Sequence, residues 1–346
     1  MEILATSNSL KNISFARHKN DNNNFTNQLI FTVMKQNRFL IVTMLLISAT
    51  IITSCNGYPG TITNNKVEVQ FSSNILTMGG TTKAAGNTWD ATDAIGIYMY
   101  AESTLDVVEN IKNIKYITDD GGITGSFKPT GTKIYFPDNG DKVRFMAYYP
   151  QLDGIQVNDI YPVNVADQSE QEDIDLLYSF NQSAKYDKKS PDRKVSLVFD
   201  HQLTKIHVNV KAGEGLSNSD LQDIVVSFSG FNTTADFKLT DGFLNNLGAP
   251  EDIDMLKITA KEGYAASFEA IVLPSTEIPT ASIVFDLKNG SIEPEIVNDI
   301  FTWDFNNTLN KSTRYIYNVT INRSGIVVEA TINDWTSTNE EDIDAK

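Results

Sequence analysis

The sequence has almost no cysteine: Cys55 is the only one in 346 residues. A single cysteine cannot form an intramolecular disulfide, so no disulfide framework stabilises the fold. Histidine is also scarce, with three residues, and the chain contains no His-Glu-x-x-His, no Gly-x-Ser-x-Gly and no glycine-rich phosphate loop. The sequence therefore gives no basis for a zinc protease, a serine hydrolase or a nucleotide-dependent enzyme. We predict a protein without enzyme activity, and without a metal or cofactor.

Long apolar runs are rare as well, and the one that stands out lies near the N-terminus. Residues 39–52 read FLIVTMLLISATII, 14 uncharged residues that follow Lys35 and Arg38. A membrane-spanning helix needs roughly 20 apolar residues, so this run has the length of the apolar region of an export signal. We interpret residues 34–54 as a signal peptide. Residues 1–33 are interpreted as an upstream segment that is wrongly included or discarded; a cytoplasmic tail ahead of a signal anchor is the alternative.

The single cysteine lies directly after this apolar run. The residues Ile52, Thr53, Ser54 and Cys55 resemble the lipobox of bacterial lipoproteins, in which the cysteine sulfur receives a diacylglyceryl group and the freed amine is acylated. Two or more acyl chains give stable membrane anchoring. We therefore predict Cys55 as a lipid attachment site, followed by a turn-rich tether over residues 55–66. A buried free cysteine is the alternative.

Positive charge is in short supply. The formal net charge is 28 − 44 = −16, and without residues 1–54, which carry five basic and two acidic residues, it is 23 − 42 = −19. An acidic chain repels phosphate backbones, so nucleic acid is not an expected partner. About 290 residues remain after the signal peptide, enough for two domains of ordinary size.

The remaining sequence consists of short runs in which apolar and polar residues alternate, separated by Gly, Asn, Asp and Pro. The best helical segment, residues 170–177, is short. The pattern predicts an all-β chain of two consecutive β-sandwich domains, residues 67–193 and 194–346, divided at the polar, proline-containing segment 181–194. Twelve strands are expected, at residues 67–71, 95–100, 111–117, 133–136, 143–149, 195–199, 205–210, 224–228, 267–273, 282–287, 315–321 and 326–332.

One motif has a clear physical interpretation. In WDATDAIGIY (residues 89–98), Trp89 is expected to plug one end of a sandwich. Asp90 and Asp93 are expected to cap the turn with local hydrogen bonds, and Gly96 to allow a close backbone approach in the following strand.

The same motif resembles the W-x-x-x-D-x-I-G-[IV]-[YF] signature of the fimbrillin family, which comprises subunits of type V pili and related surface lipoproteins of Gram-negative anaerobes. Further matches follow in the family's order, at residues 134–137 (IYFP), 145–150 (FMAYYP), 175–178 (DLLY), 199–206 (FDHQLTKI), 270–274 (AIVLP), 315–317 (YIY) and 332–335 (INDW). The resemblance implies sandwich domains of the transthyretin-like type. It also implies a surface-exposed lipoprotein of the cell outer membrane that serves as a structural, accessory or tip component of a fimbria in cell adhesion.

The family resemblance further implies assembly by strand exchange: a protease removes the first strand, and the emptied groove accepts a strand from a neighbouring subunit. Lys83, in GGTTKAAGN (residues 79–87), is the candidate processing site, because a cut there would remove VEVQF (residues 67–71) together with the lipid. Lysine stands where the family often has arginine. The alternatives are an ordinary surface lysine on an uncut, anchored subunit and, for the whole protein, a surface glycan-binding lipoprotein. The expected partners are other pilus subunits, the outer membrane and a receptor on a host or bacterial surface.

His201 invites a metal-binding interpretation, since Asp200 is adjacent and His207 follows six residues later. The spacing does not match a compact zinc site, and no second group of ligands is near in the sequence. We expect His201 to be a structural histidine that is hydrogen-bonded where strands meet.

Overall fold

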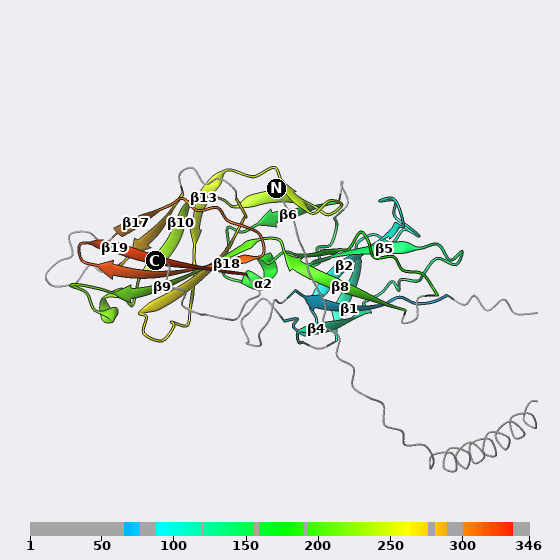
Figure 1. Ribbon diagram of the computed structural model, residues 1–346, viewed down its shortest axis with the longest axis horizontal. Coiled ribbons are helices and arrows are strands. Elements are labelled where there is room, and N and C mark those ends of the chain that lie inside the picture. The colour runs from blue at the N-terminus through cyan, green and yellow to red at the C-terminus, as the bar shows by residue number, and fades with distance from the viewer. Residues whose placement is uncertain are drawn as a thin grey trace, which may run out of the picture. The chain divides into compact units, whose positions relative to one another are not determined.

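The computed structural model describes residues 66–76, 88–119, 121–155, 159–189, 193–275, 281–288 and 300–334. These residues fall in one compact unit, Asn65–Lys346. The all-β prediction is confirmed: the described chain is built from strands, with a short helix α2 (Gln171–Ile174) and a 3-10 turn at Asn218–Leu221 (Figure 1). Neither of these helical segments is long and apolar enough to cross a bilayer.

Seven strands close into a barrel, in which each strand is hydrogen-bonded to two neighbours. Their order around the barrel is β1 (Gln70–Ile75), β4 (Thr124–Pro129), β3 (Ile114–Thr118), β2 (Ala94–Ala101), β5 (Val143–Tyr149), β7 (Leu177–Phe180) and β8 (Lys194–His201). The N-terminal part was expected as a two-sheet sandwich. The ladder is continuous instead, because β1 pairs on one side with β4 and on the other with β8.

The other strands form three open sheets. The first has the order β13 (Pro250–Asp254), β10 (Val225–Asn232), β16 (Ala281–Asp286) and β17 (Ile300–Phe305), and the second β12 (Phe243–Asn245), β11 (Thr234–Lys238) and β6 (Ile160–Asn164). The third has the order β14 (Leu256–Ile258), β15 (Ala266–Val272), β9 (Thr204–Ala212), β18 (Thr313–Asn322) and β19 (Gly325–Asp334).

The expected boundary between residues 193 and 194 does not coincide with the change of sheet. β8 follows that boundary in sequence, yet pairs with β1 and β7 in the barrel, whereas β6 precedes it and pairs with β11. The chain leaves the barrel between His201 and Thr204, where β9 begins. Division into two domains stays a prediction.

Two expected strands differ most from what is observed, and a third, expected at residues 111–117, begins only at Ile114. Residues 133–136 form no strand, only a single bridge between Tyr135 and Glu68, because the proline at 137 ends the run. The first strand was expected at residues 67–71 and lies at Gln70–Ile75, so the polar stretch SSN is part of the strand. Pairing with β4 and β8 along this stretch outweighs its low strand propensity.

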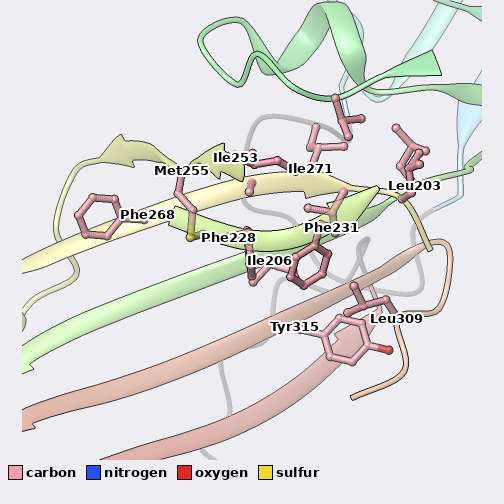
Figure 2. Close-up of a cluster of buried hydrophobic side chains, with 14 of the residues drawn as sticks. Leu203, Ile206, Phe228, Phe231, Ile253, Met255, Phe268, Ile271, Leu309 and Tyr315 are labelled. Carbon is pink, nitrogen blue, oxygen red and sulfur yellow. The ribbon is translucent and has the colours of Figure 1, made fainter. Parts of the chain in front are cut away.

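The barrel interior is one apolar cluster, which includes Trp89, Phe71, Phe127, Phe145 and Phe199. A second cluster joins residues of the open sheets with Tyr98 and Tyr148 of the barrel strands β2 and β5. Figure 2 shows part of it, with Ile206 of β9, Phe268 and Ile271 of β15 and Tyr315 of β18 near Phe228 and Phe231 of β10. Strands such as β1 and β8 contribute alternate residues to these clusters, as their period of two requires, and loop residues such as Trp89 and Leu309 complete them.

The WDATDAIGIY motif adopts the expected local structure. Trp89 is buried, and the backbone N–H of Asp90 donates to Asp93 Oδ2 at 2.7 Å. A Cβ at Gly96 would overlap the ring of Tyr148 on the neighbouring strand β5, so only glycine fits there.

Candidate functional site

β1 is the strand that closes the barrel. It runs antiparallel to β4, with Phe71 opposite Phe127, and parallel to β8, with Phe71 beside Val195 (Figure 1). At its ends, the Gln70 N–H donates to the carbonyl of Arg193 at 3.0 Å and the Leu76 N–H to that of Phe199 at 2.9 Å. Since β1 has a partner on each side, its loss would leave two unpaired strand edges facing each other.

One face of this segment is buried in the barrel. Val69, Phe71, Ser73 and Ile75 are each at most 3% exposed, while the intervening Gln70 and Asn74 face solvent. Burial of each of the three apolar side chains, Val69, Phe71 and Ile75, stabilises the folded state by about 1.5–3 kcal/mol. The inward residues therefore stabilise β1 in its place.

Aromatic rings line the space that β1 fills. The ring of Phe71 makes edge-on contacts with Tyr116 and Phe145, each with centroids 5.2 Å apart. Burial raises the pKa of the Tyr116 hydroxyl to about 12, so this ring is neutral at physiological pH. The Ile134 N–H donates to that hydroxyl at 2.9 Å, which fixes the ring's position.

Trp89 forms the far end of the same space. Its ring lies edge-on to Phe127, Tyr149 and Phe199, with centroids 5.2, 5.5 and 5.2 Å away. Each such ring pair stabilises the folded state by about 0.5–1.5 kcal/mol, in addition to the effect of burying its apolar surface. A barrel without β1 would thus expose an apolar, largely aromatic groove between β4 and β8.

The residues that lead into β1 are bonded to the segment that contains Ile134 and Phe136. The Val69 N–H donates to the carbonyl of Ile134, and the Phe136 N–H to that of Val67, each at 2.9 Å. Glu68 pairs with Lys133 at 2.8 Å, but both side chains are largely exposed. An exposed ion pair stabilises the folded state by about 0–1 kcal/mol. The buried contacts in the groove therefore contribute more to holding β1 than this ion pair does.

The predicted site residues Cys55 and Lys83 lie outside the described residues. Lys83 belongs to residues 77–87, between Leu76, which follows β1, and Thr88, which precedes Trp89. A cut after Lys83 would therefore separate β1 covalently from all the other barrel strands. A cut after Lys66 would leave β1 attached, because Lys66 precedes the strand.

The two histidines lie in separate hydrogen-bonded clusters. His201 is buried, and its Nδ1 is 2.8 Å from Asp175 Oδ1, which agrees with the expected structural role. His207 lies between Glu269, at 3.0 Å from Nδ1, and Asn209, at 2.8 Å from Nε2. Across the described ranges, no group of three or more potential ligands is placed to hold a metal ion.

His207 belongs to a buried charged network on β9, β15 and β18. Glu269 lies 2.7 Å from Lys205 and 3.2 Å from Arg314, and its side chain is 14% exposed. Burial by itself would raise the pKa of Glu269, but the hydrogen bond with His207 and the charges of Lys205 and Arg314 lower it to about 2. The network connects three strands of one sheet, which is not the sheet that contains β1, β4 and β8, so we assign it a stabilising role.

This network predicts a specific acid sensitivity. The folded-state pKa of Glu269 lies below its ordinary value of 4.5, so its stabilisation is present above pH 4.5 and is lost as the pH falls toward 2. Glu269→Gln should lower the free energy of unfolding by about 3 kcal/mol at pH 7, and flatten its dependence on pH between 4.5 and 2. Urea unfolding at several pH values measures both effects. The exposed Glu329→Gln is the control, with an expected change within about 0.5 kcal/mol. An equal loss in both variants would contradict the role of the network.

The last strand, β19, is docked in its own sheet. It pairs with β18 along its whole length, Gly325–Asp334, and lies at the edge of the five-stranded sheet. Val327 and Ile332 are 54% and 65% exposed. Such an apolar edge strand is available for pairing with another chain.

Sequence reasoning located this region but missed its most important residues. VEVQF (residues 67–71) indicated a strand, whereas Ser73 and Ile75, which also face the barrel interior, were not recognised. The signal was available: Val69, Phe71 and Ile75 share one face at a spacing of two, and only Ser73 breaks the pattern.

The chain is similar to known proteins in both sequence and structure. A family model described as fimbrillin-like matches residues 82–335. A Bacteroides uniformis protein named as a candidate fimbrium subunit, Fim1C, is 33% identical over 267 residues, 75% of this chain and 82% of its own length.

Solved structures give the same result. A candidate cell adhesion protein from Bacteroides uniformis is 30% identical, with a TM-score of 0.63 over 79% of this chain and 99% of its own. Another from Bacteroides ovatus, 20% identical with a TM-score of 0.58 over 79% of this chain and 99% of its own, shares the fold.

Proposed function

The chain belongs to the fimbrillin-like family, and from this premise we propose that it is a structural or tip subunit of a type V pilus that functions in cell adhesion. We propose that it assembles by losing β1 and accepting a strand from a neighbouring subunit. The observation that supports this most directly is the position of β1: one strand, first among the described residues, closes an otherwise complete barrel.

Removal of β1 would create two kinds of unsatisfied surface. The facing edges of β4 and β8 would expose backbone N–H and C=O groups, and the rings around Phe71 would be exposed to water. Exposed strand edges and apolar grooves both favour association. An extended segment from another subunit satisfies both at once, because its backbone completes the ladders and its alternate side chains fill the groove.

The incoming strand must come from outside the barrel. Residues 326–332 alternate suitably, but β19 is fully paired with β18 and would have to leave its sheet. The donor is therefore either a released β19 or a segment of a different subunit.

The lipid anchor completes the proposal. Cys55 precedes β1 and Lys83 follows it, so a cut after Lys83 would separate the barrel covalently from the lipid as well as from β1. We infer that the uncut subunit is held at the outer membrane and that processing makes it available for assembly. In this scheme other pilus subunits are the partners and no enzyme activity is required of the chain.

Lysine-specific proteolysis tests this function. We expect a protease acting on the folded chain, expressed without residues 1–55, to cut first after Lys83 and to convert monomers into oligomers on size-exclusion chromatography. Lys83→Gln should remain monomeric under the same treatment, whereas Lys66→Gln should behave as the unaltered chain does. Persistence of monomers after a complete cut at Lys83 would contradict strand exchange between copies of this chain and leave a different subunit as the donor.

The alternative function, glycan binding, gains no support from the surface. Proteins that bind glycans on a flat face generally present exposed aromatic rings. Among the described residues, Phe243, at 67% exposure, is the only aromatic residue that is mostly exposed. The remaining described rings are buried or half-buried, where packing accounts for them.

A further inference from the structure

Ser73 is the exception among the inward residues of β1. Val69, Phe71 and Ile75 are apolar, but Ser73 is equally buried, at 1% exposure. Its Oγ has no hydrogen-bond partner. A buried hydroxyl without a partner is unfavourable, because water bonded to it in the unfolded chain.

The pocket around Ser73 is small. The residue opposite on β4 is Gly125, and a Cβ built there would be 3.0 Å from Ser73 Oγ, from Trp89 Cδ1 and from Phe127 Cε2. Ser73 Oγ, Trp89 and Phe127 thus converge on the open face of Gly125, and a longer side chain at position 73 would extend into this space, against Trp89 or Phe127.

The wall of this pocket is also rigid. The Trp89 ring is held by edge-on contacts with Phe127, Tyr149 and Phe199, and it is itself 1% exposed. Well-packed interiors do not expand easily, so a bulky residue would be rejected rather than accommodated. The pocket therefore limits both the size and the polarity of its occupant.

We propose that the Ser73 pocket selects the strand that enters the groove, accepting alanine best, serine less well and larger residues poorly. This inference rests on the proposed strand exchange and identifies the partner: an extended segment with alanine two residues after an aromatic or aliphatic residue and two residues before another aliphatic one. Ser73 leaves β1 weaker than such a competitor. The strand that holds the barrel closed is thus built to be displaced.

The first test uses the intact chain and does not depend on strand exchange. Ser73→Ala should raise the thermal midpoint by about 2–4 °C, because it removes the unpaired hydroxyl without a cavity larger than one atom. Ser73→Leu should lower the midpoint by at least as much. Ser72 provides matched controls, because it is also a serine of β1 but is not buried in the barrel. Ser72→Ala and Ser72→Leu should shift it by less than about 1 °C.

The second test measures selection directly. Chain cut after Lys83 and separated from the N-terminal fragment that carries β1 is mixed with labelled peptides of residues 67–76 that carry serine, alanine or leucine at position 73. We expect the alanine peptide to bind about fivefold more tightly than the serine peptide, and the leucine peptide at least tenfold more weakly. Peptides varied at position 72 should bind alike.

The outcomes separate the two proposals. A lower midpoint for Ser73→Ala, or equal binding of the three peptides, would overturn selection at this pocket while leaving strand exchange intact. If no peptide binds although the intact variants behave as expected, the groove accepts no strand. Strand exchange then fails, and the selecting role of Ser73 fails with it.

Discussion

Replacing Phe71 by alanine is expected to destabilise the barrel by about 4 kcal/mol. Phe71 is 3% exposed, and its ring contacts Tyr116 and Phe145 edge-on at 5.2 Å. The substitution removes the buried ring, leaves a cavity between two other rings and abolishes both ring–ring contacts. The barrel closes through β1. We therefore expect the substitution to weaken the binding of β1 between β4 and β8.

Trp89 provides a local probe for this measurement. It lies in the same cluster as Phe71, whereas Trp303 lies on β17 in a different sheet. In a Trp303→Phe, Trp335→Phe background, urea unfolding followed by tryptophan fluorescence reports on the barrel alone. The midpoint for Phe71→Ala should fall while the slope stays constant.

Asn74→Ala is the matched control for Phe71→Ala. Asn74 lies on the same strand with its side chain in solvent, so the change should stay within about 0.5 kcal/mol. A loss below about 1 kcal/mol for Phe71→Ala would mean that β1 does not occupy the barrel in solution. The groove, and the pocket at Ser73 with it, would then have to be abandoned.

Replacing Cys55 by alanine is expected to move the protein from the membrane fraction to the soluble fraction. The prediction depends on the sequence alone, because Cys55 lies outside the described residues. Two or more acyl chains on one residue give stable anchoring, and the acidic chain offers no electrostatic attraction to anionic lipids. Without the thiol there is no attachment point, so the effect should be nearly complete.

Ser54→Ala is the control for Cys55→Ala, since it keeps a small residue before the cysteine and leaves the thiol in place. Its membrane fraction should match that of the unaltered chain. Fractionation of whole cells, with labelled palmitate as a second readout, measures both variants. Unchanged partitioning of Cys55→Ala would refute the lipid anchor and leave the coupling between processing and release without a basis.

The fold class and many of the strands could be predicted because their signals are local. β5 and β18 are runs of apolar and aromatic residues, and β8 alternates with a period of two. β13 was missed, because only Ile253 of its five residues is buried and its pairing with β10 compensates for a polar sequence. β17 was missed even though Phe301, Trp303 and Phe305 alternate.

The candidate site could be predicted only in outline. The sequence indicated that a strand lies between the tether and Lys83, which was sufficient to propose its removal. It placed that strand about three residues too early, since Ser72, Ser73 and Asn74 read as a loop. The network around Glu269 was not foreseen, because Lys205, Glu269 and Arg314 come from three strands that are far apart in the chain.

By itself, the sequence predicted an export signal ahead of the lone cysteine, and it determined the all-β class and the faces that most strands bury, because each of these depends on neighbouring residues. Only the tertiary structure decided that β1 closes a barrel between β4 and β8, and that Ser73 lies against Gly125 and Trp89. The period of a strand fixes which side chains share a face, but not which distant strand pairs with it. That choice depends on how all the strands pack together, and it places β1 where its removal, as we propose, would open a groove.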